Sequence, residues 1–272
     1  MEIYSAITLI NPVKQAMEMG CKGNNLFSYY FYDMWKNDFS FFTEHSRNIL
    51  LDSGAFSILQ QSKKSEKPNI NVIESFLNNY CRFIRKHDND IIQGYFELDL
   101  GQFINYFKVK QYRAKIQKVT DKIIPVWHQY LGIQEFKSMV NTYDYIAIGG
   151  LAGSNRRPPV NYFKPFVKYA HKKGKKIHLL GLTEKKLLKN LPFDSVDSTA
   201  WHRCRFGEVT KEIGKDGSRN VQQLNTNYIS NNYEKLITYD YIQSIKQQDY
   251  YRQYWQGYTN KQEKRIQRRI TI

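Results

Sequence analysis

Lys122–Trp127 reads KIIPVW, Tyr145–Gly150 reads YIAIGG and Lys176–Gly181 reads KIHLLG. These runs are apolar almost throughout, with no alternation between apolar and polar residues, and Asn48–Asp52 (NILLD) has the same texture. Continuous apolar strands are typical of a parallel sheet that is covered on both faces. The four segments therefore predict an α/β protein with a buried parallel sheet.

Strand-like runs alternate with amphipathic segments over residues 1–206. We expect strands at Ile3–Thr8, Asn48–Asp52, Ile91–Asp99, Lys122–His128, Tyr143–Gly149, Lys176–Gly181 and Ser195–Ala200. We expect helices at Asn71–His87, Gln102–Ile116, Ile133–Val140, Val160–His171 and Thr183–Leu188. This repetition predicts right-handed parallel crossovers and favours a TIM-like (β/α)8 barrel over an open doubly wound sheet. Neither GxGxxG nor GxxxxGK[ST] opens a helix, which disfavours dinucleotide and P-loop sites.

The pattern changes after Phe206. Lys215-Asp216-Gly217, within Val209–Asn220, predicts a turn between two short strands. Val221–Tyr258 then has helical spacing. We therefore divide the chain into a TIM-barrel core at 1–206 and an extension at 207–272, made of a short hairpin and a helical, basic C-terminal part.

The composition is strongly basic. The 272 residues include 41 Lys and Arg against 25 Asp and Glu, a net charge of +16, and 15% are aromatic. These values favour a polyanionic partner, most simply nucleic acid. The 41% hydrophobic content excludes a disordered chain, and no apolar run approaches the ~18 residues of a membrane span. We find no signal peptide, and the three scattered cysteines are typical of a reducing cytoplasm.

Acidic residues lie beside several expected strands. Asp52 ends one strand, Asp99 ends another, and Asp194 and Asp197 lie together at a third. In a TIM barrel the active site forms at the C-terminal strand ends, where neighbouring carboxylates raise one another's pKa values. One carboxyl group can then serve as an acid while another stays ionised, as displacement at a sugar anomeric carbon requires. Taken alone, Asp52 would be better explained as a cap of the following helix.

The order of these motifs resembles the tRNA-guanine transglycosylase superfamily. DSGAF at Asp52–Phe56 is followed by a strand ending in Asp, IAIGGLAG at Ile146–Gly153, HLLG, and FDSV at Phe193–Val196. That family carries DSGG[FY], AIGGL, a Leu/Met-Gly strand and FD[CS] in the same order on a TIM barrel. The similarity spans Asn48 to about Trp201 and implies base-exchange chemistry.

The resemblance implies roles for three of the carboxylates. Asp52 would be the general acid/base that handles the proton of the base. Asp194 would be the nucleophile that attacks C1′ and forms a covalent glycosyl-enzyme. Asp197 is a competing candidate for the nucleophile, because it lies only three residues further along.

The resemblance also implies a binding site for a guanine-like base. Phe56 and Leu180 would stack on its two faces, and Asp99 would hydrogen-bond to its edge. The family has a Gln after the strand that here ends PVWHQ, and either His128 or Gln129 corresponds to it. Further contacts are expected from Ser53, Gly54, Gly149, Gly150 and Gly181.

The chain departs from the tRNA-acting members of that family. These bind zinc through a CxCxxC group and a distant His, whereas this sequence has neither CxC nor CxxC. Cys204 and His202 alone are too few for a four-ligand zinc site, so we expect no metal and no cofactor. The chain is shorter and basic, and looks more like the DNA 7-deazaguanine transglycosylase (DpdA) branch of bacteria and phages.

The expected function is therefore pentosyl transfer: guanine in DNA is replaced by a free 7-deazaguanine base such as preQ0, in the cytoplasm of a bacterium or phage-infected cell. A tRNA-guanine (queuine or preQ1) transglycosylase without zinc is the alternative. A catalytically inactive barrel that binds nucleic acid and an unrelated TIM-barrel glycosidase also remain open. The cations expected to hold the nucleic-acid backbone are Arg156, Arg157, Arg203, Arg205, Lys264, Arg265, Arg268 and Arg269.

Overall fold

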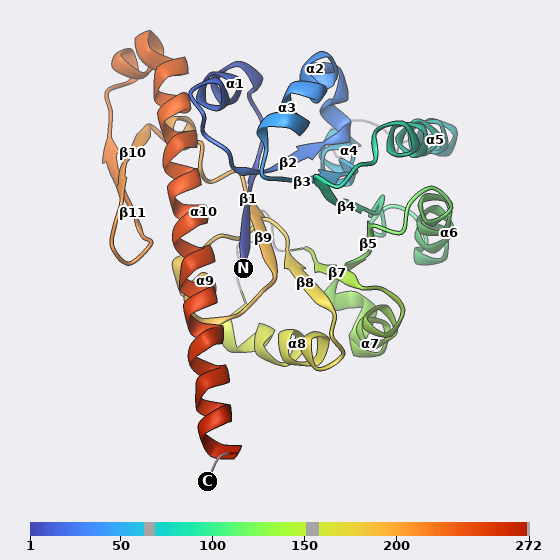
Figure 1. Ribbon diagram of the computed structural model, residues 1–272. Coiled ribbons are helices and arrows are strands. Elements are labelled where there is room, and N and C mark those ends of the chain that lie inside the picture. The colour runs from blue at the N-terminus through green and yellow to red at the C-terminus, as the bar shows by residue number, and fades with distance from the viewer. Residues whose placement is uncertain (63–68, 151–157, 271–272) are drawn as a thin grey trace.

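The structure is a computed structural model, and the description covers residues 1–62, 69–150 and 158–270. Of residues 61–62 and 258–270 only the backbone is described. Parallel strands in the middle of the molecule are surrounded by helices, as Figure 1 shows.

The parallel sheet closes into a barrel. Its strands are β1 (Glu2–Ala6), β2 (Asn24–Ser28), β3 (Asn48–Asp52), β4 (Ile92–Phe96), β5 (Ile123–Ile124), β6 (Val126–Trp127), β7 (Tyr145–Ile148), β8 (Lys176–Leu179) and β9 (Ser195–Ser198). They pair in the order β5-β4-β3-β2-β1-β9-β8-β7-β6. Only Pro125 separates β5 from β6, and its carbonyl accepts from the N–H of Ala147 at 2.9 Å. The two short strands are thus one barrel strand interrupted at a proline, which has no N–H to donate.

Helices follow every barrel strand. They are α1 (Ile10–Glu18), α2 (Tyr32–Trp35), α3 (Phe39–His45), α4 (Ala55–Ser62), α5 (Ile70–His87), α6 (Tyr106–Gln117), α7 (Gly132–Thr142), α8 (Val160–Lys172), α9 (Lys185–Asn190) and α10 (Thr226–Ile270). Short 3-10 turns are η1 (Tyr29–Phe31), η2 (Lys36–Asp38), η3 (Gln129–Leu131) and η4 (Arg203–Phe206). An antiparallel hairpin, β10 (Glu208–Ile213) and β11 (Arg219–Gln223), separates β9 from α10.

The expected (β/α)8 barrel is confirmed, and the sequence reasoning missed one of its strands. Each of the seven expected strands is present, although Ile91–Asp99 ends already at Phe96 and Lys122–His128 is divided at Pro125. The missed strand is β2, whose sequence NNLFS holds only two apolar residues. The hairpin expected around Lys215-Asp216-Gly217 is also present.

Apolar side chains fill most of the barrel interior. They come from the inward-facing positions of seven strands and form one cluster: Tyr4, Ala6, Leu26, Leu50, Phe96, Ile124, Val126 and Ala147. On β8 and β9 the inward positions are polar instead, with His178, Ser195 and Asp197 all buried. The interior is therefore a packed core with one polar seam, which leads along β8 and β9 to the C-terminal end of the barrel.

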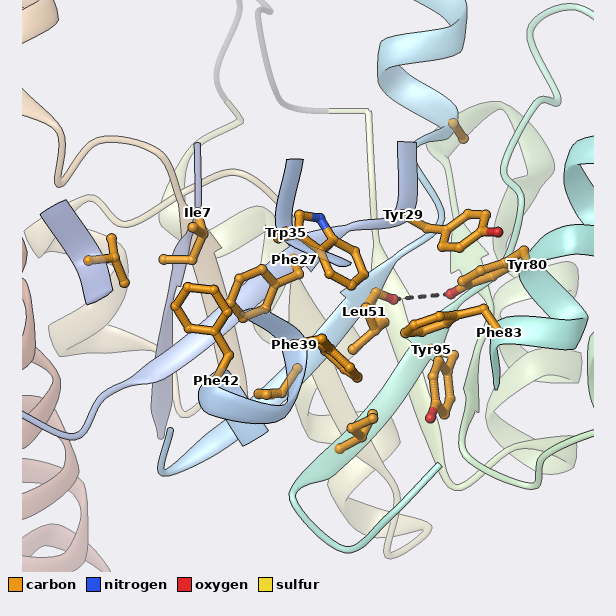
Figure 2. Packing of buried hydrophobic residues seen from close by; sticks show 14 of the residues in the cluster. Ile7, Phe27, Tyr29, Trp35, Phe39, Phe42, Leu51, Tyr80, Phe83 and Tyr95 are labelled. Carbon is orange, nitrogen blue, oxygen red and sulfur yellow. Dashed lines mark hydrogen bonds between the residues drawn. The ribbon is translucent and has the colours of Figure 1, made fainter. Parts of the chain in front are cut away.

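A large aromatic cluster packs between β2, β3, β4 and the helices outside them (Figure 2). Phe27 on β2 contacts Trp35 and Phe42, with ring centroids 5.6 and 4.9 Å apart. Tyr80 on α5 donates hydrogen bonds to the carbonyls of Leu51 and Phe96, at 3.3 and 3.2 Å. This hydroxyl binds α5 to the ends of β3 and β4, which are the strands that lead to Asp52 and Asp99.

Helix α10 occupies the position of the eighth barrel helix, beside β1 and α1 (Figure 1). The Tyr241 hydroxyl donates to Asn25 Oδ1 at 2.7 Å, and Arg252 forms an ion pair with Glu2 at 2.6 Å. Successive contacts thus run towards the beginning of β1, so the end of α10 points away from the C-terminal end of the barrel. The expected boundary at residue 206 therefore places α10 outside the core, although α10 is the helix that completes the ring around the barrel.

Candidate active site

Three carboxylates gather at the C-terminal end of the barrel, which we call the mouth. Asp52 is the last residue of β3, Asp197 lies on β9, and Asp99 follows β4. Because all barrel strands are parallel, these positions lie at the same end. The charges of Asp197 and Asp99 both raise the pKa of Asp52, so the three groups lie within electrostatic reach of one another.

Asp52 has a strongly altered acidity. Burial raises its pKa to about 6, the two neighbouring carboxylates add to the rise, and the Ser28 hydroxyl and the Gly54 N–H oppose it. The Gly54 N–H donates to Oδ2 at 3.0 Å. A carboxyl group with a pKa of about 6 is present in both protonation states near neutral pH. Such a group can donate and accept a proton in one catalytic cycle.

Asp197 is buried and held through a single oxygen. Its Oδ1 accepts from the Gly181 N–H at 2.9 Å and contacts His178 Nε2 at 3.0 Å. Among the described residues, no group hydrogen-bonds to its other oxygen, Oδ2. This geometry fixes the carboxylate in one orientation and leaves one oxygen available to a ligand at the mouth.

Asp194, which we expected at the mouth, lies at the opposite end of the barrel. It precedes β9, and its Oδ2 accepts from the Ile177 N–H at 2.8 Å and contacts His171 Nε2 at 2.9 Å. Its carbonyl accepts from the N–H of Glu2 at the start of β1. The expected placement is wrong because Asp194 enters the strand, whereas active-site residues lie where strands end. Asp197, the competing candidate, is the carboxylate that joins Asp52 and Asp99.

Asp99 is paired with His128. A short hydrogen bond joins Asp99 Oδ2 to His128 Nε2, and the His128 ring stacks on Tyr130 with centroids 5.4 Å apart. A Cβ on Gly149 would lie 3.0 Å from His128 Cε1, and a Cβ on Gly150 would lie 2.7 Å from Nδ1. Both glycines are therefore needed to let the His128 ring pack over the end of β7. Separately, the resemblance implies that Gly149 and Gly150 contact the base.

One expected substrate contact is wrong, and two others are not supported. The Ser53 side chain is fully buried and its hydroxyl donates to the Glu97 carbonyl at 2.8 Å, so it joins β3 to β4. The Gly181 N–H is used by Asp197 and acts on that carboxylate. Gln129 begins the exposed turn η3, whereas His128 is the residue beside Asp99. Of the two alternatives in PVWHQ, His128 therefore belongs to the site.

The remaining base-binding candidates border the mouth. Phe56, in the first turn of α4, is 53% exposed and free to stack on a ligand. Leu180 follows β8 and packs at the edge of the barrel-interior cluster. Gly54 has a φ of +86°, and a Cβ there would lie 2.3 Å from Tyr30 Cβ. The absence of a side chain at Gly54 thus lets η1 lie directly against the turn that carries Asp52.

Buried Glu97 shapes the site without belonging to it. Its two oxygens accept from Arg113 at 2.7 and 3.0 Å, and Oε1 also accepts from the Val126 N–H at 2.6 Å. This pair links β4, β6 and α6 just below Asp99. Removal of either partner would leave an uncompensated buried charge.

The expected backbone-binding cations have different surroundings. Arg205 is exposed beside β9 and donates to Thr199 Oγ1 at 2.8 Å. Arg203 is half-buried and forms an ion pair with Glu208, so part of its guanidinium already has a partner, and its expected phosphate contact stays a prediction. Arg156 and Arg157 lie outside the described residues. The last four cations, Lys264, Arg265, Arg268 and Arg269, belong to the far end of α10, of which only the backbone is described.

Within residues 1–62, 69–150 and 158–257, no three His, Cys, Asp or Glu side chains gather as metal ligands. Cys204 Sγ lies 3.8 Å from Asp240 Oδ2, and burial raises the pKa of this thiol to about 12. His202 Nε2 lies 3.3 Å from the Tyr233 hydroxyl. Both side chains thus have protein partners that join η4 to α10.

Sequence reasoning overlooked His178 as a site residue, although a signal for it was present. His178 and Leu180 are two positions apart in HLLG, and side chains at this spacing lie on one face of a strand. If Leu180 faces the ligand, His178 faces the barrel interior below it. Ser28 ends β2, the strand that the sequence did not reveal. Tyr30 and Tyr130 had no comparable signal, because they reach the mouth only through the segments after β2 and β6.

No family model matches the sequence, and no curated protein matches it. Solved structures do match: a variant of the tryptophan synthase α-subunit from the hyperthermophile Pyrococcus furiosus has a TM-score of 0.50 and 12% identity, over 92% of this chain and 97% of that chain. A second variant of the same subunit gives 0.49 and 12%, with the same coverage. The chain is a TIM barrel. At this level of identity the likeness extends to the fold alone.

In the part of this TIM barrel that is described, no helix is long and apolar enough to cross a membrane. The barrel also explains why its chemistry-bearing residues come from distant segments, since each strand delivers its end to the same mouth. The function therefore depends on the chemistry of these carboxylates and not on the fold.

Proposed function

We propose that the protein is a DNA base-exchange enzyme that replaces guanine with a 7-deazaguanine base through a covalent Asp197-glycosyl intermediate. The observation that carries the proposal is the division of labour between two mouth carboxylates. Asp52 has a pKa of about 6, whereas Asp197 is anchored through Oδ1 with Oδ2 open. One group is suited to carry a proton and the other to attack carbon.

In the first step Asp197 Oδ2 attacks C1′ of the target deoxyguanosine. The bond from Oδ2 to C1′ forms as the bond from C1′ to N9 breaks, and the electron pair of that bond leaves on the base. A proton from Asp52 neutralises the departing guanine. The sugar is inverted at C1′, and Asp197 now carries it as an ester.

In the second step the incoming base reverses these events. Its N9–H gives a proton to Asp52, N9 attacks C1′, and the ester bond breaks with its electron pair returning to Asp197. Two inversions give net retention, as in glycosidases that use two carboxylates. Asp52 ends the cycle protonated, ready for the next guanine.

Recognition of the base rests on Asp99, His128 and Phe56. Asp99 is held by His128 through Oδ2. In the described part of the chain no group hydrogen-bonds to its Oδ1, which can accept from N–H groups on the edge of a guanine-like ring. The exposed Phe56 offers a face for stacking. A base in a duplex must leave the stack to reach such a mouth, at a cost of a few kcal/mol.

Nucleic acid is favoured as the partner by the charge of the chain, and DNA over tRNA by the sequence motifs. The net charge of +16 suits a phosphate backbone, and exposed Arg205 lies beside the mouth. The sequence motifs resemble the transglycosylases that act on DNA, and the zinc-binding CxCxxC group of the tRNA-acting members is missing. The alternative polymer, tRNA, is an outcome of the test below.

The test compares Asp197→Asn with Asp194→Asn. The two carboxylates are three residues apart in the chain but lie at opposite ends of the barrel, which makes the second variant a matched control. The protein is incubated with guanine-containing DNA or tRNA and free preQ0, and the nucleosides are analysed by mass spectrometry. We expect preQ0 in DNA with the wild type and with Asp194→Asn, and a loss of at least a thousandfold with Asp197→Asn.

Three outcomes would contradict the proposal in different ways. Incorporation into tRNA alone would replace DNA with tRNA as the polymer. Full activity of Asp197→Asn would move the nucleophile elsewhere. Nucleic-acid binding without incorporation of any base would indicate an inactive barrel.

A further inference from the structure

A continuous chain of polar groups runs inside the barrel to Asp197. The Tyr145 hydroxyl contacts Ser195 Oγ, Ser195 Oγ contacts His178 Nδ1, and His178 Nε2 contacts Asp197 Oδ1. His178 is fully buried, and the ring of Phe96 packs against its imidazole with centroids 5.0 Å apart. The chain therefore crosses an otherwise apolar interior.

Such a chain costs free energy unless every member is paired, because a buried polar group without a partner loses its hydration. Apolar residues fill the equivalent inward positions on the other strands, so the fold itself does not require these polar groups. The chain ends at the one carboxylate to which the proposed function gives the role of nucleophile. This placement points to a role in the reaction.

If Asp197 is ionised and His178 is neutral, the protons of the chain can be arranged in only one direction. An ionised Asp197 needs a donor, so His178 must carry its proton on Nε2. Its Nδ1 is then an acceptor for the Ser195 hydroxyl, and Ser195 Oγ accepts from Tyr145. Burial raises the pKa of Tyr145, which keeps its hydroxyl protonated and able to donate.

We propose that His178 is a positioning residue for Asp197: held in the Nε2–H tautomer by Ser195 and Tyr145, it anchors Oδ1 and directs Oδ2 towards C1′. This inference rests on the proposed function, in which Asp197 is the nucleophile. His178 touches neither the base nor the sugar in this arrangement and acts only through the carboxylate.

The hydrogen bond from His178 also changes the equilibrium between free Asp197 and Asp197 that is esterified to the sugar. His178 donates to a full negative charge while Asp197 is free, but to a neutral ester carbonyl once the sugar is attached. Charge-assisted hydrogen bonds are about twice as strong as neutral ones. His178 therefore stabilises the carboxylate as the leaving group of the second step, and its removal should favour the ester.

The experiment measures the fraction of covalent protein–DNA adduct on a denaturing gel. The wild type is incubated with a guanine-containing oligodeoxynucleotide and a fixed concentration of free guanine, without an incoming 7-deazaguanine. We expect His178→Phe to raise the ratio of adduct to free enzyme about tenfold. His178→Gln, which restores an N–H donor, should return the ratio towards the wild-type value, and Ser195→Ala should give a smaller rise.

The matched control is His171→Phe, because His171 contacts Asp194 at the other end of the barrel just as His178 contacts Asp197. We expect no change in its adduct ratio. An unchanged or lower ratio in His178→Phe, with adduct in the wild type, would overturn the role of His178 and leave the proposed function intact. No adduct in the wild type would overturn the proposed function.

A measurement on the free protein tests the tautomer whether or not an adduct forms. Nitrogen-15 spectra of histidine-labelled protein, assigned by the loss of one signal set in His178→Gln, should show His178 protonated at Nε2 alone. A proton on Nδ1 alone would reverse the direction of the chain and overturn the inference.

Discussion

At the scale of single residues, three carboxylates share one mouth but have different partners. Asp52 accepts from a backbone N–H, Asp197 is held by a backbone N–H and a histidine, and Asp99 is held by a histidine. Burial decides the acidity of Asp52, since it raises the pKa more than any single neighbour does. Different surroundings thus allow the same functional group to serve three purposes.

The raised pKa of Asp52 predicts how stability depends on pH. A carboxyl group with a folded-state pKa of about 6, against an ordinary 3.8, binds its proton more tightly when folded. Its contribution to stability is therefore full below pH 3.8 and is lost as the pH rises through 6. We expect Asp52→Asn to raise the free energy of unfolding at pH 8 by up to about 3 kcal/mol, while abolishing base exchange.

Urea denaturation at pH 5 and pH 8 measures this effect, with the exposed Asp90→Asn as the control. The advantage of Asp52→Asn should shrink at pH 5, where the wild-type group is largely protonated. An equal advantage at both pH values would show that the removed charge is not its cause.

The candidate site shows which residue roles a sequence can predict. Asp52, Asp99 and Asp197 could be proposed because acids at strand ends share the mouth of a parallel barrel. Asp194 was misplaced although the expected strand already began at Ser195, after it. Strand alternation could suggest that His178 faces the barrel interior. That its partner there is Asp197 depends on the register between β8 and β9, which one sequence does not specify.

At the scale of elements, β2 shows why one strand was missed. Asn24 and Asn25 are fully buried, and their side chains find partners in Glu2 and Ser46. Asn is rare in strands, and only these tertiary partners make it suitable here. Strands such as β7 and β8 were predictable because their apolar residues need nothing more specific than a covered sheet.

The turn between β3 and α4 gives a test at the same scale. Gly54 and Gly132 both have positive φ, +86° and +74°, but a Cβ at Gly54 would meet Tyr30 at 2.3 Å whereas one at Gly132 would meet nothing within 4 Å. We expect Gly132→Ala to cost about 1 kcal/mol of stability, from backbone strain. Gly54→Ala should cost about 3 kcal/mol, since overpacking adds to that strain.

Chemical denaturation of both variants separates strain from steric overlap. Gly54→Ala should also weaken base exchange, because the shift that relieves the overlap with Tyr30 moves the backbone N–H of residue 54, which alanine retains, away from Asp52. Equal losses of stability in the two variants would mean that Tyr30 moves away without cost. The close packing of η1 on this turn would then contribute nothing to the free energy of unfolding.

At the scale of the whole molecule, the mouth carboxylates and the far end of α10 lie towards opposite ends of the barrel. The carboxylates gather at the mouth, whereas α10 passes beside β1 (Figure 1) and continues towards the opposite end. Near that end, the side chains of Tyr254 and Trp255 donate to the carbonyls of Lys189 and Leu188 on α9. The segment 258–272 adds five Lys or Arg and one Glu beyond those contacts. In the proposed function, this separation divides the binding of the DNA backbone from the reaction at one base.

A chain that ends at residue 257 tests this division. Because the described contacts between α10 and the barrel all lie before that point, we expect an unchanged melting temperature. Affinity for DNA should fall, and the slope of log Kd against log salt concentration should decrease by up to about 4, at about 0.9 for each lost phosphate contact. Covalent adduct at saturating DNA should stay the same, since the helix backbone that is removed runs away from the mouth. Arg205→Ala in the full chain is the comparison: it should lower the slope by about 1 and also reduce adduct formation, because Arg205 lies beside β9.

If the shortened chain kept its salt dependence but lost the adduct, the C-terminal segment would act at the mouth. The separation between the mouth and the DNA-binding end of α10 would then be wrong.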